Sequence, residues 1–179
     1  MKKLFSFALA IIFSLFLTGC VGNSAQTPSQ PISGAYKFDA INLNFIQNHQ
    51  PENVVYQDKS VVETKLNNEI KNQLAQKNLL NANSSEQIHI DLDYQREFVG
   101  EATFAKTDSI GNIFFTYEIK IIKNNEIVRA VTQNNKMRYN PGFFGNLKTI
   151  AGANRSDDFE NGAIVAIAKE LVEQIEKIK

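Results

Sequence analysis

Apolar and polar residues alternate along several stretches of the chain, as they do in β-strands that bury one face. Residues 88–95 show this most clearly, because Ile, Ile, Leu and Tyr alternate there with His, Asp, Asp and Gln. A second run covers 113–121, and 127–133 is expected to return beside it. The connecting Asn124-Asn125 suits a tight hairpin turn, since asparagine tolerates left-handed backbone conformations. The pattern therefore predicts one strand followed by a hairpin.

Residues 36–45 carry the same alternation but change phase halfway. Tyr36 and Phe38 are followed by an adjacent pair, Ala40 and Ile41, after which the apolar residues occupy the odd positions. One extra residue in a strand, a β-bulge, would return both halves to a common buried face. We therefore predict a strand with a bulge near Ala40-Ile41.

Two stretches repeat apolar residues every four positions, which predicts amphipathic helices. The first is expected over 60–79, and Ser60 and Glu63 at its start have the spacing of a capping box. The second is expected to begin near 156–158, where a serine and two aspartates can cap free N–H groups. The apolar stripes are Val62, Leu66, Ile70 and Leu74 in the first helix, and Phe159, Ala163, Ile167, Leu171 and Ile175 in the second.

These elements follow the order β-α-β-β-β-α. Strands with one apolar face need a cover, and two amphipathic helices can supply it. The sequence therefore predicts an α+β fold, a two-layer sandwich whose mostly antiparallel sheet is covered on one face by two helices. It is expected to occupy residues 35–179 as a single domain. The stretch 140–154, rich in glycine and asparagine, is expected to be a loop.

The N-terminus has the organisation of an export signal. Lys2 and Lys3 precede an apolar run over 4–17, which is shorter than the roughly 20 residues of a membrane-spanning helix. Leu17-Thr18-Gly19-Cys20 follows. A cysteine can also be an ordinary buried core residue, but its place directly after the apolar run favours a role in processing.

These four residues resemble the bacterial lipobox. The resemblance implies that Leu17, Thr18 and Gly19 are the recognition residues and that the signal peptide, residues 1–19, is removed. It implies that the Cys20 thiol receives diacylglycerol, with acyl chains such as palmitate, and becomes the mature N-terminus. Each buried CH₂ contributes about 0.8 kcal/mol, so two or three chains form a durable membrane anchor.

Residues 20–34 are expected to be the lipidated cysteine and a flexible tether, because the stretch is rich in Ser, Gly, Pro, Asn and Gln. An ordered arm lying on the domain near Pro31-Ile32 is the alternative. Val21 follows the cysteine, where an aspartate typically retains bacterial lipoproteins at the inner membrane. The resemblance therefore implies the cell envelope, at the periplasmic side of the outer membrane.

Composition narrows the list of partners. The chain has 179 residues, with 19 basic and 19 acidic side chains and a formal net charge of zero. Binding to nucleic acid depends on neutralising phosphates, so no nucleic-acid partner is expected. The one cysteine excludes an intramolecular disulfide.

The sequence predicts no catalytic site, no metal site and no cofactor. His49 falls in a loop and His89 on a polar strand face, and neither has a metal-ligand neighbour at the required spacing. Asp91 and Asp93 share one strand face about 7 Å apart. Such a pair can hydrolyse glycosides, although the wet side of a sheet explains it as well. No nucleophile elbow or phosphate-binding loop occurs.

Apolar residues in polar loops are the candidate binding residues. Phe143, Phe144 and Leu147 lie within 140–154, and Phe104 in the 100–112 loop is expected to extend the same patch. The alternative is that these rings fold back over the sheet.

The lipobox, tether and small body together resemble the small periplasmic or outer-membrane auxiliary lipoproteins that assist transport and lipopolysaccharide assembly. The resemblance implies a non-enzymatic binding or assembly module with an envelope protein or lipid as its partner. A structural or antigen-like surface lipoprotein without a ligand is the first alternative, and an unrecognised hydrolase using Asp91 and Asp93 is the second.

Overall fold

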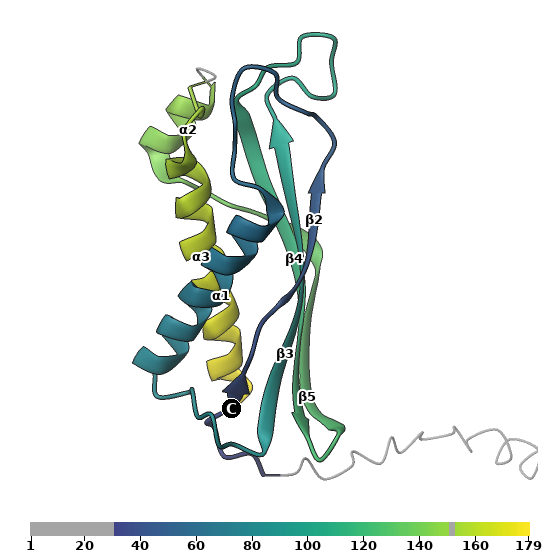
Figure 1. The fold of residues 1–179 in the computed structure, drawn as a ribbon, viewed down its shortest axis with the longest axis vertical. Coiled ribbons are helices and arrows are strands. Elements are labelled where there is room, and N and C mark those ends of the chain that lie inside the picture. The colour runs from purple at the N-terminus through teal and green to yellow at the C-terminus, as the bar shows by residue number, and fades with distance from the viewer. Residues whose placement is uncertain (1–30, 151–152) are drawn as a thin grey trace, which may run out of the picture.

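The computed structural model describes residues 31–150 and 153–179. A sheet forms one layer, and α1 and α3 cover one of its faces as the second layer (Figure 1). This confirms the predicted two-layer α+β sandwich. The elements are β1 (Lys37–Phe38), β2 (Asn42–Gln47), α1 (Lys59–Gln76), β3 (Glu86–Phe98), β4 (Ile110–Lys123), β5 (Glu126–Arg138), α2 (Gly142–Ile150) and α3 (Asp157–Lys177).

The sheet is mostly antiparallel. β3, β4 and β5 form a meander of long strands, and β1 and β2 both pair with the outer edge of β3 in parallel. Asn124 and Asn125 turn between β4 and β5 with φ values of 52° and 66°. These left-handed conformations confirm the predicted hairpin turn.

The predicted phase change near Ala40-Ile41 divides the first strand in two. Phe38 pairs with Ile88 and Asn42 pairs with Asp91, so four steps on one strand match three on the other. The extra residue explains why the apolar positions change parity. The backbone N–H of Ile41, which leaves the strand ladder here, donates to Oδ1 of Asn67 on α1 at 2.8 Å.

The first helix begins one residue earlier than predicted, and its cap differs. Asp58 is the N-cap, and its carboxylate accepts hydrogen bonds from the Val61 backbone at 2.9 Å and the Ser60 hydroxyl at 2.7 Å. The predicted capping box of Ser60 and Glu63 is therefore wrong, because Ser60 already lies in the first turn. The predicted apolar stripe is fully buried.

The expected loop over 140–154 is also wrong in part, because α2 forms there. Two glycines and an asparagine among its nine residues hide this short helix from a propensity argument. Hydrogen bonds at both ends hold it: Oδ1 of Asn140 accepts from the Gly142 backbone at 3.0 Å, and the Thr149 hydroxyl accepts from Nδ2 of Asn154 at 2.7 Å.

A buried ion pair joins the sheet to α3. Arg96 on β3 and Glu160 on α3 are 2% and 0% exposed, and Nε of Arg96 donates to Oε1 of Glu160 at 3.0 Å. The Tyr94 hydroxyl donates to the same carboxylate oxygen at 2.8 Å. Removing either charge would leave the other buried without compensation.

Candidate functional site

Three segments meet at one end of the sandwich (Figure 1). They are residues 48–58 between β2 and α1, residues 99–109 between β3 and β4, and α2; we call them together the loop end. Each presents an exposed apolar side chain: Val55 is 97% exposed, Phe104 fully exposed and Leu147 48% exposed. A single exposed apolar side chain is normal on a protein surface, and what distinguishes these three is that their segments meet at one end of the molecule.

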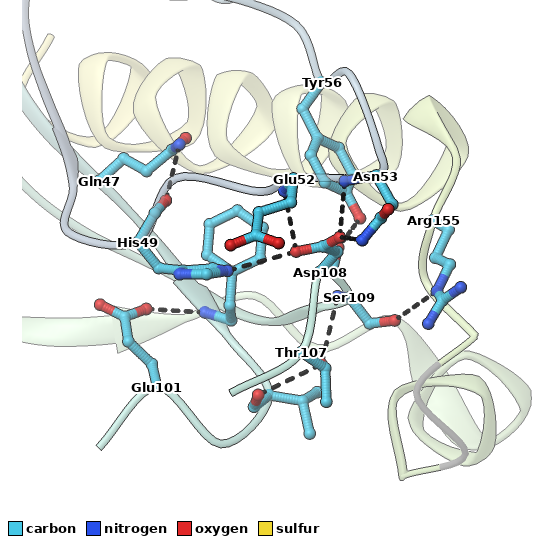
Figure 2. A network of polar contacts seen from close by, with 12 residues as sticks. Gln47, His49, Glu52, Asn53, Tyr56, Glu101, Thr107, Asp108, Ser109 and Arg155 are labelled. Atoms are coloured by element: carbon cyan, nitrogen blue, oxygen red, sulfur yellow. Dashed lines mark hydrogen bonds and ion pairs between the residues drawn. The ribbon is translucent and has the colours of Figure 1, made fainter. Parts of the chain in front are cut away.

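The Asp108 carboxylate connects the first two segments (Figure 2). Its Oδ2 accepts hydrogen bonds from the backbone and the side chain of Asn53, at 2.8 and 2.9 Å. Its Oδ1 accepts from the Glu52 backbone at 3.2 Å and lies 3.4 Å from Nε2 of His49. These contacts, those from Asn53 first, lower the pKa of Asp108 from 3.8 to about 2.

Tyr56 links the residues that follow α2 to the same point, and Asn154 among them donates a hydrogen bond to Thr149 of α2 at 2.7 Å. Its hydroxyl lies 2.5 Å from the carbonyl oxygen of Asp108 and 2.8 Å from that of Asn154, and its proton can go to either. Burial raises the pKa of Tyr56, so the hydroxyl stays protonated and able to donate. The Ile110 backbone N–H donates to the Asn154 carbonyl at 3.1 Å, and Nδ2 of Asn154 donates back to the Ile110 carbonyl at 3.2 Å.

His49 is part of this junction and not a solvated loop residue. Its side chain is 16% exposed, and its ring packs edge-on against Phe98 with centroids 5.0 Å apart. Tyr56 packs on the same Phe98 ring at 5.7 Å. The junction therefore combines a polar hub at Asp108 with an aromatic cluster beneath it.

The segment that carries Phe104 is itself folded tightly. Gly100 has φ of 76°, and a Cβ placed there would overlap the Ala105 carbonyl. The Thr103 backbone donates to the Gly100 carbonyl at 2.9 Å, and the Thr107 backbone donates to the Val99 carbonyl at 2.9 Å. An open hollow of about 560 Å³ lies beside it, lined by residues 97–103, Gly111, Asn112 and Thr149. Phe104 thus projects from a held loop beside this hollow.

The structure brings only some of the predicted binding residues together. Phe104 and Leu147 lie in segments of the loop end and are exposed, so neither packs over the sheet. Phe143 and Phe144 fall within α2, but their side chains lie outside the described part of the structure. Leu17, Thr18, Gly19 and Cys20 also lie outside the described residues.

Sequence reasoning missed the residues that join the segments, and Val55 with them. Asp108, Tyr56 and Asn154 have no motif spacing, and their partners are 52 to 98 positions away in the chain. The only available signal is that residues 108–110 lie near the end of the predicted 100–112 loop, shortly before the strand predicted from 113.

The predicted pair Asp91 and Asp93 lies on the uncovered face of the sheet. Asn42 and Asn44 of β2 each donate an amide hydrogen bond to one of these carboxylates at 2.9 Å. Lys120 lies 3.3 Å from Asp91. The hydrogen bond from Asn42, with Lys120 and His89 nearby, lowers the pKa of Asp91, whereas a general acid needs a raised pKa. The pair is better explained as a cross-strand ladder.

Within residues 31–150 and 153–179, no group of three or more His, Cys, Asp or Glu side chains is arranged to hold a metal ion. Of the helices that the structure describes, none has the length and apolar character needed to cross a membrane.

The chain has a weak structural neighbour among known proteins. No protein-family model matches the chain, and no curated protein matches it. Among solved structures, the chain is similar to a minor lipoprotein from Acinetobacter baumannii, with 14% sequence identity and a TM-score of 0.37 over 79% of this chain and 94% of the other. Likeness at this level carries no argument about function, which rests on the residues of this chain.

Proposed function

We propose that this protein is a lipid-anchored cell-envelope protein that binds an envelope protein or lipid through its loop end, without catalysing a reaction. The anchor follows from the lipobox-like Leu17-Thr18-Gly19-Cys20, in which Cys20 carries the acyl chains. Val21 favours the periplasmic side of the outer membrane. An assembly or transport-accessory role fits such a module.

The observation that carries the binding proposal is the joining of the loop end through Asp108, which connects 48–58 with 99–109, and through Tyr56, which connects them with Asn154 after α2. Fixing loops costs conformational entropy, and a surface that is already fixed avoids this cost when a partner binds. The hydrogen bonds to Asp108 and Tyr56 hold 48–58, 99–109 and 153–155 relative to one another. The exposed Val55 and Phe104 project from two of these held segments.

The Asp108 carboxylate is suited to holding the loops in place and not to acid–base catalysis. A carboxylate with a pKa of about 2 stays ionised near neutral pH and is a weak base. Its two oxygens already accept hydrogen bonds from Glu52 and Asn53. These features support a role for Asp108 in holding the loops, and the lowered pKa of Asp91 weighs against the hydrolase alternative, which would use Asp91 and Asp93.

Photo-crosslinking in intact cells tests the proposal. A photoreactive amino acid at position 104 is expected to give a discrete adduct, because Phe104 is fully exposed on the proposed surface. The matched control places the same group at Val165, which is 49% exposed and lies on α3. Val55→Ser and Leu147→Ser are expected to weaken the adduct from position 104 without changing the melting temperature.

Equal adducts from positions 104 and 165, or an adduct from 104 that Val55→Ser and Leu147→Ser leave unchanged, would contradict the proposal. Absence of any adduct would favour the alternative, a structural or antigen-like lipoprotein without a specific ligand.

A further inference from the structure

We infer that the loop end faces away from the bilayer that holds the acyl chains, and that its partner is therefore a protein and not the lipid of that bilayer. This inference rests on the proposed function and narrows it. It depends on where the chain enters the folded domain and on how far the preceding residues can reach.

The chain enters the domain at the end opposite the loop end. The first part of the described chain lies near the β4–β5 turn, and we call this end of the sandwich the hairpin end (Figure 1). The Lys123 ammonium at the end of β4 donates to the Pro31 carbonyl at 3.2 Å. Ile32 packs against the core, so this part of the expected tether is an ordered arm.

Glu86, the first residue of β3, fixes the entry point. Its side chain is 1% exposed and accepts hydrogen bonds from the Ser33 backbone and hydroxyl, both at 2.8 Å, and from Lys123 at 3.0 Å. Burial alone would raise the pKa of Glu86, but the bonds from Ser33 and Lys123 outweigh burial and lower it. The arm is therefore held by a buried, ionised carboxylate.

Hydrogen bonds continue from this point into the body. The Ser84 hydroxyl donates to the Ala35 carbonyl at 2.7 Å, and the Tyr36 backbone donates to the Leu79 carbonyl at 2.8 Å. The Lys179 side chain lies about 3 Å from the position that a Cβ on Gly34 would occupy. Entry of the chain at the hairpin end is thus a feature of the folded domain.

The length of β3 separates the entry point from the loop end. The strand runs from Glu86 to Phe98, and a strand rises about 3.3 Å per residue, so its ends are about 40 Å apart. The 99–109 segment that carries Phe104 begins directly after Phe98.

The residues before the arm are too few to bring the loop end to the bilayer easily. Cys20 and Pro31 are eleven positions apart in the sequence. Even a fully extended chain spans at most about 3.3–3.6 Å per residue, so this stretch reaches no more than about 40 Å. With the long axis of the domain along the bilayer normal, the loop end could point into the bilayer only if the whole stretch ran straight along the full length of the domain.

The hairpin end lies beside the bilayer in this arrangement. Ile127, 59% exposed, follows the β4–β5 turn at this end. A contact between Phe104 and a protein approaching from the other side does not compete with the acyl anchor. The exposed apolar residues of the loop end are then free to bind such a protein.

Energy transfer to the bilayer surface tests the inference. The chain has one cysteine, and acylation blocks it, so Phe104→Cys and Ile127→Cys each offer one reactive thiol in the full-length lipidated protein. Each variant is purified from membranes, labelled with a donor dye and reconstituted into phosphatidylethanolamine–phosphatidylglycerol vesicles that carry an acceptor on some headgroups. We expect efficient transfer from position 127 and a large loss of transfer at position 104.

Transfer from position 104 equal to or greater than that from position 127 would overturn the inference while leaving the anchor and the binding proposal intact. Intact-mass measurement of the same samples distinguishes failure of the inferred orientation from failure of the proposed anchor. An unmodified Cys20 would remove both the proposed anchor and the inference built on it.

Discussion

The Asp108 carboxylate accepts hydrogen bonds from two consecutive backbone N–H groups and one side chain of a loop more than 50 positions away. A charged acceptor makes stronger hydrogen bonds than a neutral one. The same bonds lower the pKa of Asp108 to about 2. A single residue thus determines how the 48–58 segment lies against the 99–109 segment.

Asp108→Asn is expected to lower the free energy of unfolding at neutral pH and to flatten its acid dependence. The folded-state pKa of Asp108 is about 2, below the ordinary 3.8. Its contribution is therefore complete above about pH 4 and is lost as the pH falls towards 2. Urea unfolding at pH 5 and pH 2.5 should show the difference between wild type and Asp108→Asn narrowing at the lower pH.

Tyr56→Phe is the matched control, because it weakens the same junction through a hydroxyl whose pKa is raised above 10. Its difference from wild type is expected to be the same at both pH values. If the difference in free energy of unfolding between wild type and Asp108→Asn is also the same at both pH values, then the ionised form of Asp108 does not stabilise the junction.

The buried charge of Arg96 was within reach of sequence reasoning. Arg96 has the same parity as Ile88, Ile90, Leu92 and Tyr94, so the strand period places it on the buried face. The period gives no indication of its partner, since Glu160 lies 64 residues away on α3.

At the scale of the element, the close packing of Tyr139 against α3 requires a glycine in that helix, at position 162. A Cβ at Gly162 would overlap the Tyr139 hydroxyl, and the Tyr139 ring packs edge-on against Phe159 with centroids 5.3 Å apart. The glycine costs helix stability, about 1 kcal/mol relative to alanine. It allows the segment leading from β5 to α2 to lie close against α3.

Gly162→Ala is expected to destabilise the protein although alanine favours helices, because overpacking typically costs about 1–3 kcal/mol. The second substitution Tyr139→Phe removes the overlapping oxygen and should recover most of this loss. Thermal or urea unfolding of both single variants and the double variant measures the coupling. A stabilising Gly162→Ala would show that Tyr139 moves aside without cost.

At the scale of the whole molecule, the proposal gives the two ends of the sandwich different roles. The chain enters beside the hairpin end, where Glu86 and Lys123 hold Ser33 and Pro31. The exposed residues Phe104 and Val55 lie in segments of the loop end. The sheet between them is long, so in the proposed arrangement it separates the anchor from the binding surface.

Cys20→Ser tests the lipid anchor on which the proposed orientation of the domain depends. Wild-type protein isolated from cells is expected to have lost residues 1–19 and to carry the added mass of acyl chains, because the thiol is the acceptor. The serine variant is expected to show no acyl mass by intact-mass spectrometry. A wild-type chain with its leader attached and a free thiol would contradict the anchor.

The elements of this fold could be predicted because their signals are local. The stripe of Val62, Leu66, Ile70 and Leu74 repeats within one helix, and the phase change at Ala40-Ile41 occurs within one stretch of chain. The helix α2 escaped prediction because its few residues have weak propensity and its stability comes from Asn140 and Asn154.

The loop end could be predicted only as separate pieces. Phe104 and Leu147 are visible in the sequence as apolar residues in polar surroundings. The arrangement of their segments at one end of the molecule depends on Asp108 meeting Asn53 and on Tyr56 meeting Asn154, 98 positions further along the chain. Such contacts form only after the sheet and helices have set the positions of the loops. Local sequence patterns therefore decided the strands, the long helices and the expected anchor, because each depends on residues close together in the chain. Packing over long sequence separations decided which exposed residues lie at the same end of the molecule.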